Sequence, residues 1–391
     1  MVCSSEVRSH ALGPHPIGLD LLIVVDRSAS MADAGPGLGS LVQGIVDASA
    51  GLDLNVAVVT SDLGGPGVTG CRDRGDDAQL QRAPACGVAG TFVRTGSPRD
   101  PARADNVDGD LRDALACMLD LPRSACPVSQ PLAAAAAALA RPGFRRPDAA
   151  LQVAIVTDSD DCSLVARDAL IATGLPLDTE AAVDRACFTA GAQCAQDATA
   201  PGLHTGCVPR ADRGLADPIA TRDALAARDG FRVGSLTAGA EVRVDDGGGL
   251  ASACADGRST VGAPRLEALT TPEGHFTADG CGDDWRALAV GSRPRPLFQA
   301  GGCLVPSADW APTVPGAQVR CAAELERVWN DGAETREVLP MCGAEGPVAT
   351  GSCLRVGELG TPRCPAGIEV QIETDWLGPT WASVACEAPC E

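Results

Sequence analysis

A short, wholly apolar run near the N-terminus, followed at once by oxygen-bearing side chains, is the most informative pattern in this chain. Residues 21–25 read Leu-Leu-Ile-Val-Val, and Asp26, Ser28 and Ser30 come directly after them. An unbroken apolar run of this length predicts a strand that is buried on both faces, as in a parallel sheet. Ligands of open α/β sheets bind where such strands end, so these three side chains stand at the expected position of a binding site.

Further apolar runs alternate with segments of helical periodicity as far as residue 291. We expect strands at 20–26, 55–60, 91–94, 151–157, 231–237 and 274–277. We expect helices at 37–50, 107–120, 128–140 and 283–291. This order predicts an α/β fold, with a doubly wound and mostly parallel six-stranded sheet that carries one antiparallel edge strand.

Two cysteine-bearing excursions and a change of pattern near residue 304 divide the chain further. The segments 63–89 and 175–220 are loop-like, and we interpret both as insertions pinned by cross-links, because uncrosslinked loops of this length are unusual. After 304 the helical periodicity fades, and residues 368–373 alternate with period two, which is typical of a strand. We therefore expect an extended leader at 1–17, an α/β domain at 18–303, and a small disulfide-rich β module at 304–391.

The charge balance narrows the choice of partners. The chain holds 31 basic and 51 acidic residues, which gives a formal net charge of −20. A negative charge of this size repels nucleic acid and anionic membranes, and it favours the binding of cations. The chain contains no lysine and therefore no P-loop, and its histidines are not at zinc-ligand spacing.

The cysteines indicate the redox compartment of the protein. Eighteen of them are scattered without the paired spacing of zinc ribbons, which points to disulfides in an oxidising compartment, with buried free thiols as the alternative. We expect an exported protein that is secreted, periplasmic or held at the cell surface, and by proximity we expect the pairs Cys71–Cys86 and Cys117–Cys126. No signal peptide is visible and no segment is long enough to span a bilayer, but Cys3 would suit the lipid-bearing first residue of a mature lipoprotein.

Asp26, Ser28 and Ser30 form an Asp-x-Ser-x-Ser motif, and Asp158 follows the apolar run that is expected as the fourth strand. With these residues the segment 18–303 resembles the von Willebrand factor type A (VWA) domain, in particular that of secreted, cysteine-rich bacterial proteins. The resemblance implies a metal-ion-dependent adhesion site, in which two serines and a threonine contact Mg²⁺ and two aspartates hold its water molecules. Mn²⁺ and Ca²⁺ are also hard ions that such oxygen ligands suit.

Carried onto this chain, the VWA pattern assigns Ser28 and Ser30 to the two serines and Asp26 and Asp158 to the two aspartates. The threonine is missing from the matching segment 117–126. Within that segment Ser124 could replace the threonine, because its hydroxyl has the same hydrogen-bonding capacity, and the neighbouring Arg123 could instead oppose a cation. Two further carboxylates near the expected site are additional candidate ligands, namely Asp62 and Asp160.

Three functions are consistent with these residues. We favour a binding module that captures a carboxylate of a partner protein through the divalent ion. The second possibility is a structural VWA protein whose metal site is lost. The third is a metal-dependent hydrolase that uses Asp26, Asp158, Asp160 and Asp161. We expect no enzyme, because no nucleophile–base pair is visible and no histidine lies near these motifs.

A purely structural explanation of the Asp-x-Ser-x-Ser motif also exists, because aspartate and serine are preferred at helix N-caps. The identity of the partner, the oligomeric state and the role of the C-terminal module are not determined by the sequence.

Overall fold

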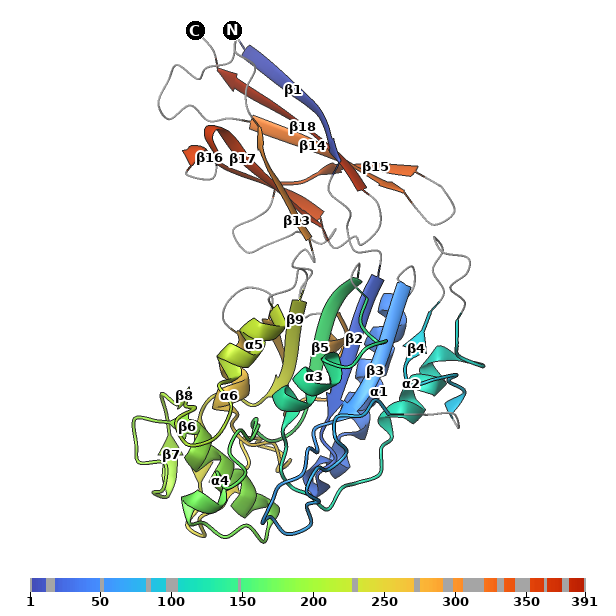
Figure 1. Ribbon diagram of the computed structural model, residues 1–391. Helices are drawn as coiled ribbons and strands as arrows, with labels where there is room; N and C mark the ends of the chain where they lie inside the picture. The colour runs from blue at the N-terminus through green and yellow to red at the C-terminus, as the bar shows by residue number, and fades with distance from the viewer. Residues whose placement is uncertain are drawn as a thin grey trace. The chain divides into compact units, whose positions relative to one another are not determined.

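The computed structural model describes residues 2–11, 18–49, 53–81, 86–95, 105–146, 149–226, 231–270, 275–290, 298–304, 320–328, 334–341, 352–361, 364–374 and 380–389. The chain divides into two compact units. One consists of residues 18–292, and the other combines 1–17 with 293–391 (Figure 1).

The first unit is built on a six-stranded sheet in the order β12-β9-β5-β2-β3-β4. Its strands are β2 (Gly18–Val25), β3 (Asp53–Thr60), β4 (Val93–Arg94), β5 (Ala149–Val156), β9 (Phe231–Thr237) and β12 (His275–Asp279). All neighbouring strands are parallel except β3 and β4. The predicted fold class is therefore confirmed, including the antiparallel edge strand.

Helices cover both faces of this sheet. Figure 1 shows α3 (Pro131–Leu139) and α5 (Pro218–Ala226) in front of it and α1 (Gly35–Ser49) behind it, where α2 (Leu111–Leu119) and α7 (Ala287–Val290) pack against α1. Leu22 and Val24 of β2 pack in one core with α3, and the alternate residues Leu21 and Ile23 are buried as well. Burial on both faces is the physical reason that residues 21–25 of this strand are all apolar.

The segment 175–220 was predicted to be loop-like, and this prediction is wrong for residues 180–191. Residues Glu180–Gly191 form helix α4, which begins with the Thr179 hydroxyl accepting the backbone N–H of Ala182. Val183, Ala186 and Ala190 lie on one face of α4 and are buried in a small core. This helical spacing is present in the sequence, but alanines and a cysteine make it a weak apolar signal.

Shorter elements complete the first unit. They are the 3₁₀ helices η1 (Ala29–Asp33), η3 (Ile171–Thr173) and η4 (Ala268–Thr270), helix α6 (Pro264–Glu267), and five short strands. The strands β6 (Ala192–Gln193) and β8 (Val208–Pro209) pair with each other, and β10 (Val242–Val244) pairs with β7 (Gly202–His204) and β11 (Leu250–Ala251).

Five disulfides cross-link this unit, namely Cys71–Cys126, Cys86–Cys117, Cys162–Cys187, Cys194–Cys207 and Cys254–Cys281. The predicted pairs Cys71–Cys86 and Cys117–Cys126 are wrong. In the structure, each of these four cysteines is bonded to a cysteine of the other predicted pair. The excursion after β3 packs against the segment before α3 instead of folding back on itself. For example, the Gln130 side chain donates to the Gly64 carbonyl at 2.6 Å.

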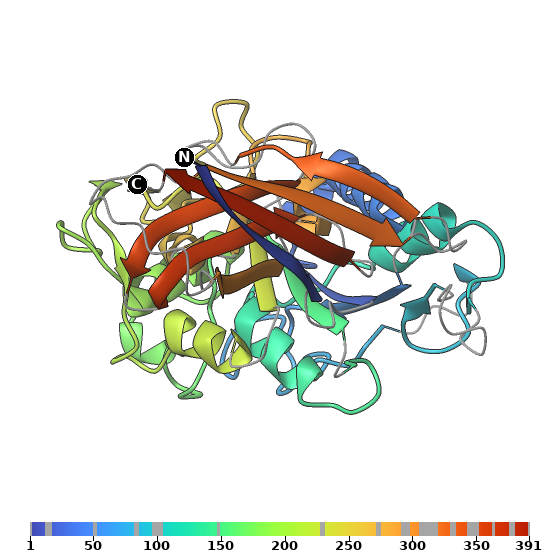
Figure 2. The same ribbon diagram turned by 90° about the horizontal axis from the view of Figure 1, so that it is seen from above.

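The second unit is made of antiparallel strands in two sheets, β1-β18-β14-β15 and β13-β17-β16. Its strands are β1 (Val2–Ala11), β13 (Phe298–Leu304), β14 (Arg320–Val328), β15 (Glu334–Leu339), β16 (Ser352–Thr361), β17 (Cys364–Thr374) and β18 (Thr380–Pro389). Figure 2 shows β1 lying beside strands from the far end of the chain.

This arrangement differs from the predicted domain limits in two places. Residues 1–17 were expected to form an extended leader, but they contain β1, which pairs with β18. This pairing provides hydrogen-bond partners for the backbone N–H and C=O groups along one edge of β18. The expected boundary at 303/304 falls inside β13, whose partner is β17, and the units divide at 292/293 instead. The helices in the described part of the chain include none with the length and hydropathy of a membrane span.

Candidate metal centre

The pairing of β2 with β5 brings two of the predicted ligands to one edge of the sheet. The strands are parallel and in register, with Val25 opposite Val156, so Asp26 and Asp158 both follow the carboxyl ends of their strands. The backbone N–H of Asp26 extends this pairing by donating to the Val156 carbonyl at 2.8 Å. Both carboxylates are largely buried, with exposed fractions of 3% and 8%.

The serine hydroxyls lie next to these carboxylates. The Oγ atoms of Ser28 and Ser30 are 3.0 Å apart, and the Ser30 hydroxyl donates to Oδ1 of Asp158 at 3.0 Å. The Asp26 carboxylate accepts the backbone N–H of Ser28 at 2.8 Å and the Thr157 hydroxyl at 2.7 Å. Adjacent ligands of an octahedral Mg²⁺ lie about 3 Å apart, because each is about 2.1 Å from the ion. The distances from the Ser30 hydroxyl to Ser28 and to Asp158 are therefore compatible with such an ion.

Helix capping does not account for the first serine. Ser28 occupies the N-cap position of η1, but its side chain makes no capping hydrogen bond. Its hydroxyl instead lies against that of Ser30.

We call the cluster of Asp26, Ser28, Ser30 and Asp158 the rim. Two side chains that were not predicted from the sequence also lie at this rim. The Ser30 hydroxyl lies 2.6 Å from Oε1 of Glu180, the first residue of α4. The Ser259 hydroxyl donates to Oδ2 of Asp158 at 2.6 Å and lies 2.9 Å from the Ser30 carbonyl. Glu180 was missed because its segment was expected to be a loop, although a threonine followed by an acidic residue is a recognisable helix start. Nothing in the sequence marks Ser259.

The carboxylates at this rim repel one another. Burial, followed by the negative charge of Asp26, raises the pKa of Asp158 to about 6, while hydrogen bonds from Ser259 and Ser30 act in the opposite direction. Burial and the charges of Asp158 and Glu180 raise the pKa of Asp184, a residue of α4, well above its ordinary value. Within the described part of the chain, no arginine forms an ion pair with these four acids.

Hard oxygen donors and uncompensated buried negative charge are what a divalent cation requires, so the residues present fit Mg²⁺. Carboxylates alone would not hold the ion, because no group of three or more His, Cys, Asp or Glu side chains in the described residues has metal-binding geometry. The hydroxyls and water molecules would have to supply the remaining ligands.

Ser124 and Asp62 do not lie at the rim. They belong to a neighbouring polar cluster that also contains Arg27 and Asp76. The Ser124 backbone N–H donates to the Arg27 carbonyl at 2.8 Å, which places this segment beside the Asp-x-Ser-x-Ser loop. Its hydroxyl, however, donates to Asp62 at 2.9 Å. The Arg27 guanidinium lies 4.0 Å from Asp62 and pairs with Asp76 at 3.0 Å. Arg123, which was the alternative to Ser124 as a residue that could oppose a cation, donates to the Met31 carbonyl.

Asp160 and Asp161 also face away from the rim, although they follow Asp158 directly. Asp160 accepts the backbone N–H groups of Arg265 and Leu266 at 3.1 and 3.0 Å and thereby caps α6. Its burial, partly offset by Arg265, raises its pKa to about 7. Asp161 forms a fully buried ion pair with Arg265 at 3.1 Å. The four aspartates that a hydrolase would need together are therefore divided between two places.

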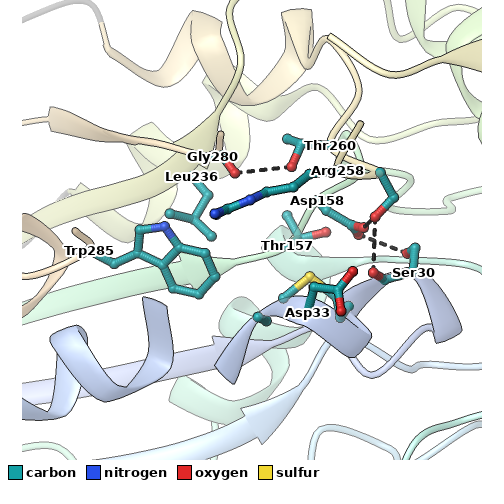
Figure 3. A pocket seen from close by; sticks show the side chains of 12 residues that line it. Ser30, Asp33, Thr157, Asp158, Leu236, Arg258, Thr260, Gly280 and Trp285 are labelled. Atoms are coloured by element: carbon teal, nitrogen blue, oxygen red, sulfur yellow. Dashed lines mark hydrogen bonds between the residues drawn. The ribbon is translucent and has the colours of Figure 1, made fainter. Parts of the chain in front are cut away.

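A pocket opens beside the rim. Figure 3 shows Ser30 and Asp158 at one end of it and Trp285 at the other, with the Arg258 side chain extending between them. Met31 and Leu236 also line this pocket. The rim is thus continuous with a small pocket that is lined in part by buried apolar side chains.

No protein-family model and no curated protein sequence matches the chain. Among solved structures it is similar to a von Willebrand factor type A protein from Catenulispora acidiphila, at 10% identity and a TM-score of 0.31 over 99% of the chain. It is also similar to the pilus adhesin SpaC from Lactobacillus rhamnosus GG, at 10% identity and a TM-score of 0.32 over 96% of the chain. A third similar structure is the pilus adhesin RrgA from Streptococcus pneumoniae, at 12% identity and a TM-score of 0.27 over the whole chain.

The chain spans 65%, 40% and 58% of the lengths of these three structures, in the same order. The function of this chain is therefore inferred from the geometry of its own site.

Proposed function

We propose that this protein is an exported VWA-type binding protein that captures a carboxylate of a partner protein through a divalent cation at the rim formed by Asp26, Ser28, Ser30 and Asp158. The observation that supports it most is the gathering of buried carboxylates and hydroxyls at the carboxyl edge of a parallel sheet, without a compensating arginine among the described residues. Such a group is costly in the absence of a cation, and a bound cation would remove that cost.

The residues divide the work of binding between them. The hydroxyls of Ser28 and Ser30 would contact Mg²⁺, or Mn²⁺ or Ca²⁺ in its place, and Asp26 and Asp158 would hold it directly or through water. When bound, the ion supplies the positive charge to which the partner's carboxylate is attracted. Glu180 already lies against Ser30, so its carboxylate would have to share the ion with the partner or give way to it.

Export is supported by the disulfides of the first unit, because a reducing cytosol does not sustain so many structural cross-links. Anchoring through a lipid on Cys3 remains part of the proposal, and mass spectrometry of the N-terminal peptide from membrane and soluble fractions of the native host would test it.

Calorimetric titration with Mg²⁺ tests the central claim. The parent chain should bind one ion, and Asp26→Ala should abolish the heat while circular dichroism shows that the fold is retained. EDTA should also abolish binding of carboxylate-bearing partners. If Asp26→Ala binds Mg²⁺ as well as the parent does, the site is assigned to the wrong residues.

One observation favours the second candidate, a scaffold whose metal site is lost. Ser124 carries the one side-chain hydroxyl that segment 117–126 offers in place of the missing threonine, and it donates to Asp62 and not to the rim. This alternative predicts no heat on titration with Mg²⁺ and no change in melting temperature, whereas an ion that binds the folded state must raise that temperature.

A further inference from the structure

Glu180 brings a carboxylate of the chain itself to the rim, beside a hydroxyl that would contact the ion. Its Oε1 atom lies 2.6 Å from the Ser30 hydroxyl and 3.4 Å from the Ser30 backbone nitrogen. We propose that Glu180 is an internal ligand of the bound ion, which occupies the coordination position that the partner's carboxylate needs and must leave it before the partner binds. This inference rests on the proposed function and adds to it the regulation of the site by a competitor within the same chain.

The distances around Ser30 place this carboxylate within reach of the ion. Adjacent ligands of an octahedral Mg²⁺ lie about 3 Å apart. The Ser30 hydroxyl lies 3.0 Å from the Ser28 hydroxyl, 3.0 Å from Oδ1 of Asp158 and 2.6 Å from Oε1 of Glu180. The Glu180 carboxylate is therefore no farther from this hydroxyl than the two groups that are already proposed to hold the ion.

The charge balance makes Glu180 and a partner's acid alternatives at the ion. The carboxylates of Asp26 and Asp158 together balance the charge of a divalent cation. Glu180 adds a further negative charge, and it interacts electrostatically with Asp158 and with Asp184, which lies one turn along α4. A partner's carboxylate that entered while Glu180 was in place would be repelled by all of these acids. If the partner's carboxylate replaces that of Glu180, the charge around the ion stays the same.

Of the acids at the rim, Glu180 is the one that can leave most easily. Asp26 and Asp158 are largely buried, and each carboxylate accepts hydrogen bonds from two other residues. Glu180 is only half-buried, and among the described residues its hydrogen bonds are with Ser30 alone. A glutamate side chain has several rotatable bonds, so its carboxylate can move from the rim into solvent by a change of rotamer.

Helix α4 itself is fixed, so the release of Glu180 is a movement of its side chain alone. The disulfide Cys162–Cys187 joins α4 to the segment that follows β5. At the end of the helix, the buried Arg265 guanidinium donates to the Gly191 carbonyl at 3.1 Å. The glutamate therefore stays near the ion at a high effective concentration. It weakens the apparent affinity for a partner in proportion to the fraction of molecules in which it occupies the ion.

Mn²⁺ serves as a paramagnetic probe of this inference on the full chain, with acetate as the simplest carboxylate and the ionic strength held constant. Water proton relaxation reports how many exchangeable water molecules contact the bound Mn²⁺, and relaxation of the acetate methyl protons reports whether acetate reaches the ion. Glu180→Gln should increase the water relaxation, because a coordination position becomes free. It should also tighten acetate binding at saturating Mn²⁺ by at least about threefold, as expected if Glu180 occupies the ion in about two molecules of three.

Two variants serve as controls. Asp178→Asn removes an exposed carboxylate two residues before Glu180 and should leave both measurements at their parental values. It separates occupation of the ion from a general change in charge. Asp26→Ala, which should not hold the ion at the rim, corrects for Mn²⁺ that binds elsewhere on a chain with a net charge of −20.

The outcomes separate the two proposals. If Mn²⁺ and acetate bind the parent and Glu180→Gln leaves the acetate affinity unchanged, this inference is overturned and the metal-mediated function stands. A lower acetate affinity in Glu180→Gln would identify Glu180 as a permanent ligand, and a gain in affinity without a gain in water relaxation would indicate repulsion at a distance; each overturns the inference. If Mn²⁺ does not bind the parent, or if acetate reaches the ion in neither protein, the proposed function fails and the inference fails with it.

Discussion

Replacing Asp158 by asparagine tests the electrostatic core of the proposal, a buried carboxylate held beside other carboxylates. The pKa of Asp158 is raised from the ordinary 3.8 to about 6 by burial and by the charge of Asp26. The folded protein therefore binds this proton more tightly than the unfolded chain does. The resulting contribution favours folding below about pH 4 and is lost as the pH rises through about 6. Near neutral pH the ionised Asp158 costs the ion-free fold about 3 kcal/mol.

Asparagine removes the charge and can keep both hydrogen bonds. Its amide oxygen can accept from Ser30, and its NH₂ group can donate to the Ser259 oxygen, whose own proton is then free to bond to the Ser30 carbonyl. Without metal, Asp158→Asn should therefore be more stable than the parent near neutral pH, by up to about 3 kcal/mol. Mg²⁺ at about 1,000 times its Kd should reverse this order, because an ion at that concentration stabilises the parent by about 4.1 kcal/mol and the variant hardly at all.

The measurement is urea unfolding followed by circular dichroism under non-reducing conditions, with EDTA and with excess Mg²⁺. Asp246→Asn, at an exposed turn position, is the control for a generic loss of one negative charge. Equal stability of parent and Asp158→Asn in EDTA, together with equal gains in Mg²⁺, would refute the reasoning that this carboxylate is strained in the absence of an ion.

Three further predictions concern the same unit. The affinity for Mg²⁺ should fall about tenfold for each pH unit below about 6, because the ion then competes with a proton on Asp158; calorimetry at several pH values measures this, and a flat profile would contradict it. Glu180→Gln should weaken Mg²⁺ binding several-fold without changing the melting temperature in EDTA by much, and unchanged affinity would show that Glu180 does not reach the ion. Arg265→Met should destabilise the unit by about 3–5 kcal/mol in urea unfolding, because it leaves Asp161 buried without its partner; a loss below about 1 kcal/mol would mean that Asp161 is protonated or solvated.

The sheet and the convergence of Asp26 with Asp158 can both be predicted from the sequence. Apolar runs such as 21–25 and 153–156 are stable only when both faces are buried, and parallel strands bring their carboxyl ends to one edge. These are local patterns combined with a topological rule, and both can be read from one chain. The strand β9 was predicted with the bounds that it has in the structure.

Which other side chains reach that edge depends on how distant segments pack together. Glu180 arrives there from 150 positions along the chain, and Ser259 from more than 200, on segments whose paths depend on packing and disulfides. Conversely Ser124 and Asp160 lie near the rim in sequence or space, but each finds a hydrogen-bond partner elsewhere. The hydrogen-bond partner of a polar loop residue depends on contacts between segments that are distant in sequence. Hydrophobic periodicity does not predict such contacts.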